Sequence, residues 1–143
     1  MFKLRNRAAS AAVGCLDALR FETTPNGVPN IPEFGSVETE AGFKALYAMS
    51  SYQHVQDGTK YPAVMLATGI NDPRVEPWES AKMAARLQAA TASGKPILLR
   101  VDYEAGHGVG STKKQGEELS ADLWTFLLWQ FGVPGFQPIG PSQ

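Results

Sequence analysis

The sequence predicts an α/β fold, in which a doubly wound, mainly parallel sheet carries helices on both faces. Its 143 residues suffice for one domain core but not for two. Apolar runs of strand length alternate along the chain with longer segments of helical periodicity, and this alternation is typical of parallel sheets. Hydrophobic residues make up 43% of the chain and charged residues 19%, which indicates a folded globular protein.

The first expected strand covers residues 8–16, AASAAVGCL, which follow three basic side chains near the N-terminus. A basic start before small apolar residues is also the pattern of a secretory signal, or even of a lipoprotein cysteine site. The alanine-rich run is barely long enough for either and meets Asp17 at once, so we favour a short buried strand. Cys15 is expected to be a small buried hydrophobic residue, because a nucleophilic thiol would need a paired base.

An irregular loop and a short helix are expected next. Residues 21–35 hold three prolines and two glycines, which indicates a loop with turns. Residues 38–49 show helical spacing at Phe43, Leu46 and Tyr47, with acidic side chains near the start of the segment. This segment is therefore expected to be a helix that leads through a polar turn into the next strand.

Two apolar runs are expected to form the centre of the sheet. The first is residues 61–69, YPAVMLATG, and the second is residues 97–103, ILLRVDY. Such short uninterrupted runs suit parallel strands that are buried on both faces. About 28 residues separate the core of the first run from the second, and a helix fits between them, so an antiparallel hairpin is disfavoured.

Two long helices are expected to cover these central strands. The first begins near Pro77, which suits a first helical turn, and ends by Gly94 and Pro96. Glu79 sits early in this helix, where its charge complements the helix dipole. The second helix is expected over residues 114–131, and its aromatic side chains are more typical of packing than of a cofactor box.

Charge and composition exclude several functions. The formal net charge is −1 and Lys and Arg form no long run, so nucleic-acid or anionic-membrane binding has no electrostatic footprint. One cysteine and two histidines exclude a disulfide framework and argue against a metal site of those ligands. No segment approaches the roughly 18 consecutive apolar residues of a membrane span. We therefore expect a soluble protein, cytoplasmic by default, with neither metal nor cofactor.

Asp72 and His107 are the candidate functional residues, because each follows one of the two central strands. Functional groups gather outside the carboxyl ends of parallel strands, so both residues fall at one edge of the sheet. His107 also stands between two glycines, whose missing Cβ atoms let backbone or ligand approach the imidazole. An aspartate that accepts the Nδ1–H of a histidine fixes its tautomer and stabilises the imidazolium. We expect these two side chains to be hydrogen-bonded.

Each of these residues also has a purely structural interpretation. Asp72 could cap the helix that begins near Pro77. His107 could be a packed histidine with satisfied hydrogen bonds, and Arg74 could be a surface ion-pair partner. His54, on a polar turn, is expected to be structural or solvated.

The order Asp then His matches the last two members of the Ser…Asp…His order of α/β-hydrolases. The serine is then expected on a G-x-S-x-G turn before the first strand. The sequence holds no such turn, because Ser10, Ser36 and Ser111 all lack the flanking glycines at the required spacing.

Several separated stretches resemble the carboxyl-terminal part of the catalytic domain of prolyl oligopeptidase-type serine peptidases. They are VGCLDALRF, EFGS with FKALYAMSSYQHV, GINDPRVEPWESAKMAARLQ and AGHGVG. The resemblance extends over residues 8–133 and implies an α/β-hydrolase fold that cleaves short peptides, classically after proline. It implies that Asp72 is the triad acid and His107 the general base. It also implies that Arg74 hydrogen-bonds a substrate carbonyl, a role that suits the planar guanidinium.

The chain departs from the family pattern in two ways. Pro73 stands where family members usually have a second acidic residue. The serine turn, the oxyanion-hole tyrosine region and the β-propeller of the family are missing from residues 1–143. The resemblance therefore implies that residues 1–143 are a partial catalytic domain, with the serine shortly before Met1. A truncated gene product and a misplaced start are both compatible with this.

Three functions stay open on the sequence alone. The first is a Ser-His-Asp peptidase of which this chain is a piece, acting on oligopeptides. The second is a non-catalytic remnant that binds a partner, or a fragment that complements another polypeptide carrying the serine. The third is an unrelated small α/β binding domain. Full-length relatives of the peptidase type could also be periplasmic.

Overall fold

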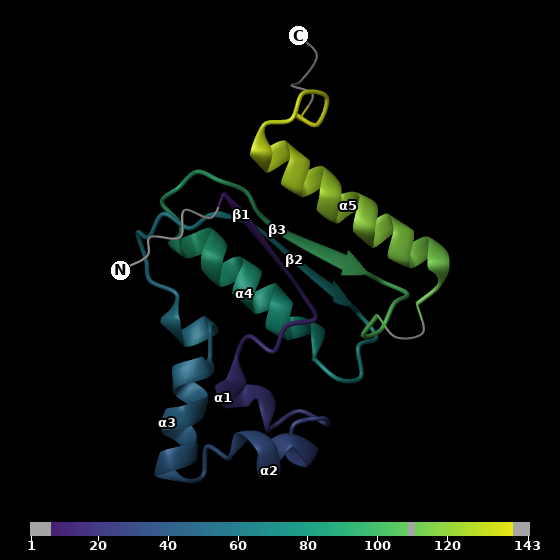
Figure 1. Cartoon of the computed structure of the whole chain (residues 1–143). Helices are drawn as coiled ribbons and strands as arrows, with labels where there is room; N and C mark the ends of the chain where they lie inside the picture. Colours follow the sequence, from purple (N-terminus) through teal and green to yellow (C-terminus); the bar gives the residue numbers. More distant parts are fainter. Residues whose placement is uncertain (1–6, 109–110, 139–143) are drawn as a thin grey trace.

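A three-stranded parallel sheet forms the centre of the molecule (Figure 1). The computed structural model describes residues 7–108 and 111–138. The strands are β1 (Ala8–Ala12), β2 (Ala63–Gly69) and β3 (Ile97–Asp102), and they lie in that order across the sheet. Both strand pairs are parallel, which confirms the predicted pairing of the two central runs.

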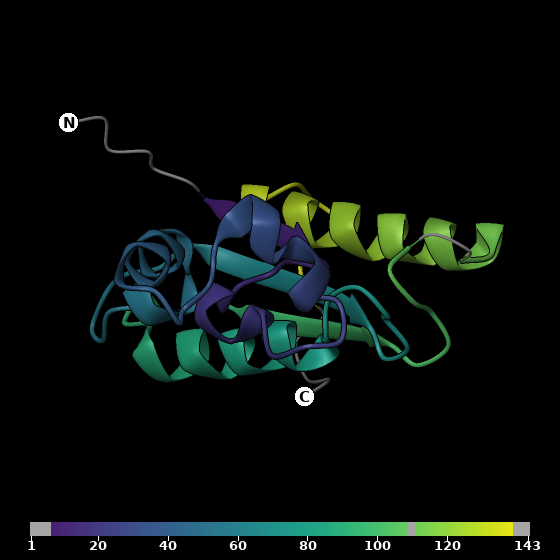
Figure 2. The same ribbon diagram turned by 90° about the horizontal axis from the view of Figure 1, so that it is seen from below.

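Two long helices cover opposite faces of the sheet, as Figure 2 shows. Helix α4 (Pro77–Ala90) connects β2 to β3 and packs against both strands. Helix α5 (Lys113–Phe131) lies on the other face, against β1 and β2. The predicted arrangement of a parallel sheet between flanking helices is therefore confirmed.

The core has two parts, one on each face of β2. Every residue of β2 is buried, because this strand is central and both of its faces are covered. The α4 side holds Val55, Val64, Leu66, Met83, Ala84, Leu87, Ala90 and Ile97. The α5 side holds Ala63, Met65 and Phe126.

Leu66→Ala is expected to lower the free energy of unfolding of the chain by about 2–5 kcal/mol, because Leu66 is 2% exposed and the substitution leaves a cavity. Urea denaturation followed by circular dichroism measures this loss. The matched control is Leu98→Ala on the neighbouring strand, where the side chain is 40% exposed. A loss at Leu66 no larger than at Leu98 would contradict this placement of the core.

The first strand is shorter than the sequence predicted. It ends at Ala12, and Val13 then adopts a φ of 49°, a left-handed conformation that is rare for a β-branched residue. Its amide still donates a 2.9 Å hydrogen bond to the carbonyl of Ala67, but the chain turns away from the sheet. The expectation that Cys15 is buried is wrong, because Cys15 lies in this turn and is exposed.

The segment expected to be an irregular loop contains short helical turns. They are α1 (Ala18–Phe21), a 3₁₀ turn at Val28–Asn30 and α2 (Ile31–Phe34). Pro29 and Pro32 stand in the first turn of the 3₁₀ element and of α2, where a missing N–H costs nothing, whereas Pro25 lies in the turn before them. Two of the three prolines therefore begin short helical turns.

The remaining helices begin at capping residues. Helix α3 (Glu40–Met49) starts two residues later than predicted, because the Thr39 hydroxyl caps it by accepting the Gly42 amide at 3.1 Å. A 3₁₀ turn, Tyr52–His54, follows it. Helix α5 begins with a capping box between Thr112 and Gln115.

Candidate active site

The loops that follow β2 and β3 touch each other at the carboxyl edge of the sheet. The Asn71 amide donates a 3.2 Å hydrogen bond to the carbonyl of Ala105. Gly69, the last residue of β2, makes this approach possible, since a Cβ there would stand 2.3 Å from the Ala105 oxygen. This close contact brings Asp72 of the first loop beside His107 of the second.

Asp72 and His107 form the hydrogen-bonded pair that the sequence predicted. The Nδ1 atom of His107 lies 2.8 Å from Oδ2 and 3.0 Å from Oδ1 of Asp72. The Asp72 side chain is fully buried, whereas the imidazole is 22% exposed. One side of the histidine is therefore held by a buried carboxylate, and the ring retains access to solvent.

The backbone around Asp72 fixes its carboxylate. Its Oδ1 accepts the amides of Arg74 at 2.8 Å and Val75 at 3.0 Å. Asp72 does not cap α4, because the residue at the N-cap of that helix is Glu76. Both of its oxygens face His107 and the following turn instead.

The electrostatics of Asp72 favour the charged form. Burial raises the pKa of this carboxyl, but hydrogen bonds from the Val75 and Arg74 amides and from His107 outweigh burial and leave the pKa below its ordinary value. The carboxylate is thus ionised at neutral pH and is placed to accept a hydrogen bond from an Nδ1–H of His107. In the tautomer with the proton on Nδ1, Nε2 carries no proton and is able to accept one.

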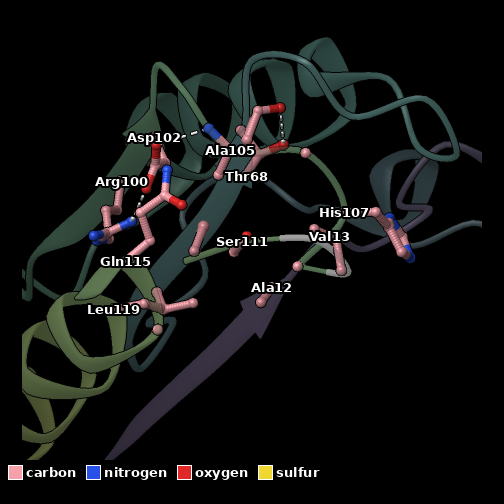
Figure 3. A pocket seen from close by; sticks show the side chains of 15 residues that line it. Ala12, Val13, Thr68, Arg100, Asp102, Ala105, His107, Ser111, Gln115 and Leu119 are labelled. Atoms are coloured by element: carbon pink, nitrogen blue, oxygen red, sulfur yellow. Dashed lines mark hydrogen bonds and ion pairs between the residues drawn. The ribbon is translucent and has the colours of Figure 1, made fainter. Parts of the chain in front are cut away.

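A pocket of about 300 Å³ opens beside His107 at the same edge of the sheet. Its walls come from the end of β1, from the ends of β2 and β3 and from the start of α5. Figure 3 shows His107 at one end and Arg100 and Gln115 at the other. The labelled lining residues are Ala12, Val13, Thr68, Arg100, Asp102, Ala105, His107, Ser111, Gln115 and Leu119.

Arg74 lies next to the Asp–His pair and presents an exposed side chain. Its amide donates to Asp72, and its carbonyl accepts the Asn26 side-chain amide at 3.2 Å. Within residues 7–108 and 111–138 its guanidinium makes no ion pair, unlike the guanidinium of Arg86, which contacts Asp57. The surface ion-pair interpretation of Arg74 is therefore not supported.

The other candidate residues lie apart from the pair or lack its chemistry. His54 hydrogen-bonds the Tyr47 carbonyl at 2.8 Å and packs against the Tyr47 ring, so it has a structural contact. Although Cys15 is an exposed residue, partial desolvation of its thiol and the negative charges of Glu79 and Asp17 raise the pKa of the thiol to about 12, so at neutral pH it is no thiolate nucleophile.

The described residues form neither a metal-binding cluster nor a membrane-spanning helix. No group of three or more His, Cys, Asp or Glu side chains in that part of the chain is placed to hold a metal ion. None of the helices described there has both the length and the apolar character that crossing a membrane requires.

The sequence did not reveal a buried polar cluster beneath the turn after β1. Asp17 and Glu79 are 1% and 0% exposed, and Lys82 contacts Asp17. In the sequence, Glu79 is already explained by its position near the N-terminus of a helix, where an exposed negative charge is favourable. Its backbone partners lie about sixty residues earlier in the chain, so no local spacing could indicate the contact.

The parallel sheet, its flanking helices and the Asp–His contact at the carboxyl edge define part of an α/β-hydrolase fold. The family model for the prolyl oligopeptidase family, Peptidase_S9, matches residues 4–134. The chain therefore belongs to the prolyl oligopeptidase family.

Characterised proteins of this family are similar to the chain over most of its length. A prolyl endopeptidase of Elizabethkingia miricola is 36% identical over 128 residues, which are 89% of this chain and 18% of the relative. The dipeptidyl aminopeptidase BI of Pseudoxanthomonas mexicana is 32% identical over 111 residues, which are 78% of this chain and 15% of the relative. The chain thus spans about a fifth of the length of the curated relatives that it matches.

Solved structures of prolyl endopeptidases and of oligopeptidase B also match most of this chain and about a fifth of their own length. A structure from a study of two prolyl endopeptidases superposes with a TM-score of 0.84 at 35% identity, covering 89% of this chain and 19% of the other. Oligopeptidase B from Leishmania major superposes with a TM-score of 0.80 at 26% identity, covering 88% and 18% respectively. These superpositions confirm the predicted hydrolase fold.

Proposed function

We propose that the chain supplies the acid and the base of a serine peptidase that cleaves oligopeptides after proline. The observation that carries this proposal is the contact of 2.8 Å between His107 Nδ1 and the buried carboxylate of Asp72. The prolyl endopeptidases and the prolyl oligopeptidase among its relatives support proline as the residue before the cleaved bond. The nucleophilic serine is then provided by polypeptide outside residues 1–143.

Each residue of the pair has a defined step. His107 Nε2 takes the proton of the serine hydroxyl as its oxygen attacks the peptide carbonyl, and then gives that proton to the leaving amine. An acyl-enzyme remains. His107 Nε2 then takes a proton from water as the water oxygen attacks the acyl carbonyl, and gives that proton to the serine oxygen as the ester bond breaks. Asp72 stays ionised throughout, holds the imidazole tautomer and stabilises the imidazolium that forms twice in each turnover.

The free edge of β1 and the adjoining pocket support the position of the missing nucleophile. Within the described residues β1 pairs only with β2, so its outer edge is open. A strand added there in parallel would end at the same edge of the sheet as His107. The strand-to-helix turn that carries the serine in α/β-hydrolases would then reach the pocket that His107 lines.

The same open edge supports a second candidate function. An unpaired strand edge is a ready template for another chain. A non-catalytic remnant that binds a partner, or a fragment that complements a polypeptide carrying the serine, would use this edge. The genomic sequence upstream of Met1 tests the two candidates. An in-frame G-x-S-x-G turn there supports a continuous enzyme, and its absence supports the remnant or complementing fragment.

Arg74→Lys is expected to lower kcat/KM of the enzyme assembled with its serine-bearing part by about 10- to 150-fold. The proposed role of Arg74 is a hydrogen bond from its guanidinium to a substrate carbonyl, and such charged hydrogen bonds contribute about 1.5–3 kcal/mol. Lysine keeps the charge but loses the planar fork. Steady-state hydrolysis of a proline-containing fluorogenic peptide measures the change.

Arg86→Lys is the matched control for Arg74. Arg86 lies on α4 and contacts Asp57 and the Val55 carbonyl, so its replacement is expected to leave kcat/KM nearly unchanged. If the two variants had equal kcat/KM, Arg74 would have no role in substrate binding.

A further inference from the structure

Glu79 fastens the turn that follows β1 to the first turn of α4. Its Oε2 accepts the Asp17 amide at 2.6 Å and the Leu16 amide at 3.0 Å. The glutamate is 0% exposed, so these hydrogen bonds are made in an environment without solvent. The carboxyl group therefore works as a buried support for the turn rather than as a surface charge near the helix start.

A second buried carboxyl group, that of Asp17, lies close to Glu79 and pairs with the nearby Lys82 ammonium. Asp17 is 1% exposed, accepts the Gln53 side-chain amide at 2.8 Å and is in contact with the Lys82 ammonium. Lys82 lies over the Tyr52 ring, 4.1 Å from its centroid. One ammonium thus neutralises one of the two carboxyl groups.

The other oxygen of Glu79 has no hydrogen-bond partner among the described residues. The titratable and charged groups that face Glu79 are the Cys15 thiol, the Asp17 carboxylate and the Lys82 ammonium. An ionised Glu79 would place a second negative charge beside Asp17, with one oxygen unsolvated and unpaired. Burying such a charge is far more costly than burying a neutral acid.

We propose that Glu79 is protonated in the folded chain at neutral pH and acts as a neutral positioning residue for the turn after β1. Burial raises the pKa of the Glu79 carboxyl, the Asp17 and Leu16 amides lower it, and the Asp17 charge raises it again, leaving it above its ordinary value. The proton removes the repulsion between the two carboxyl groups, while Oε2 still accepts both amides.

The turn held by Glu79 directly follows residues that line the pocket beside His107. Ala12 and Val13, the residues just before it, form part of the pocket wall. Loss of the proton from Glu79 would therefore disturb the wall against which the nucleophile-bearing segment packs. That consequence for catalysis rests on the proposed function, whereas the protonation of Glu79 does not.

A carbon-13 NMR titration of the 143-residue chain, labelled at glutamate Cδ, tests the proposal without any need for peptidase activity. The resonance that disappears in Glu79→Gln belongs to Glu79. At pH 7 it is expected at the chemical shift of a protonated acid, while the other glutamates show carboxylate shifts in the same spectrum. A carboxylate shift for Glu79 at pH 7, or titration together with the other glutamates, would overturn the proposal.

Thermal unfolding as a function of pH provides a second measurement. A group whose pKa is raised by folding stabilises the folded state below its unfolded pKa, about 4.3, and this stabilisation is lost as pH rises towards the folded pKa. The Tm of the unchanged chain is therefore expected to fall relative to Glu79→Gln by about 4–6 °C per pH unit in that interval.

The control is Glu117→Gln, at a side chain that is 66% exposed and pairs with Lys113 at 3.5 Å. Above pH 4.3, the Tm of Glu117→Gln is expected to change with pH in the same way as the Tm of the unchanged chain. Glu79→Ala removes both accepted hydrogen bonds and is expected to lower Tm at every pH. If the Glu79→Gln curve were also parallel to that of the unchanged chain, Glu79 would be ionised in the folded state and the proposal would fail.

Discussion

The 143-residue chain on its own is expected to hydrolyse no proline-containing peptide, and turnover is expected once a polypeptide carrying the serine turn is added. In the proposed function Asp72 orients the imidazole of His107, which accepts a proton, but without a nucleophile no acyl-enzyme forms. An enzyme that has lost a triad member still accelerates the reaction about 10³–10⁴-fold over water. This residual catalysis comes from the oxyanion hole and from substrate binding. A fluorogenic peptide with proline before the scissile bond measures the difference.

The assay compares four samples: the chain and its His107→Ala variant, each with and without the serine-bearing polypeptide. Turnover only in the complemented sample with His107 supports the proposed function. Turnover by the chain alone that is lost in His107→Ala would mean that a serine within the chain is the nucleophile. Ser111 would then be replaced first, because it lines the pocket with His107, and Ser10 second.

Asp72→Asn is expected to lower kcat of the complemented enzyme by about 10⁴-fold with little change in KM. Oδ1 of Asp72 is already engaged by the Arg74 and Val75 amides, so the asparagine keeps its carbonyl oxygen on that side. Its amide group then faces His107 and donates to Nδ1, which moves the ring proton to Nε2. In that tautomer His107 cannot accept the serine proton.

Asp102→Asn is the matched control for Asp72. Asp102 is the last residue of β3, and its Oδ1 accepts the Glu104 and Ala105 amides at 3.0 and 2.9 Å. It forms the same kind of turn as Asp72 at the end of the neighbouring strand, but without a histidine partner. We expect its replacement to change kcat by less than about tenfold. Equal losses in the two variants, with unchanged circular dichroism, would show that the effect comes from the turn and not from His107.

The sheet and the Asp–His contact could be predicted because both depend on order along the chain. The uninterrupted apolar run around Val64 indicated a strand buried on both faces. Parallel pairing then placed the residues after each strand at one edge, which brought Asp72 and His107 together. The prolines of the segment 21–35 were ambiguous, since the same residue breaks a long helix and begins a short helical turn.

The features that escaped prediction depend on contacts between distant residues. The left-handed backbone conformation of Val13 ends β1 early and leaves Cys15 exposed. None of the neighbouring residue types predicts this conformation for a valine. The role of Glu79 depends on the amides of Leu16 and Asp17, which α4 meets only after the sheet has formed. Helical position alone described Glu79 correctly as an early residue of α4 but not as a buried one.

The spacing of the strand pairs along the chain also has a kinetic consequence. β2 pairs with β3 from Val64 and Ile97 onwards, whereas β1 pairs with β2 from Ala8 and Ala63 onwards, across a longer intervening segment. Closing the longer loop costs more chain entropy, and pairings between distant residues slow folding. The unit β2–α4–β3 holds Asp72, and His107 lies in the loop directly after it. This unit can therefore assemble before β1 pairs with it. We therefore expect β1 to join the sheet last. On the proposed function, the Asp72–His107 contact would then form in a local folding step, before the strand whose open edge would receive the serine-bearing segment.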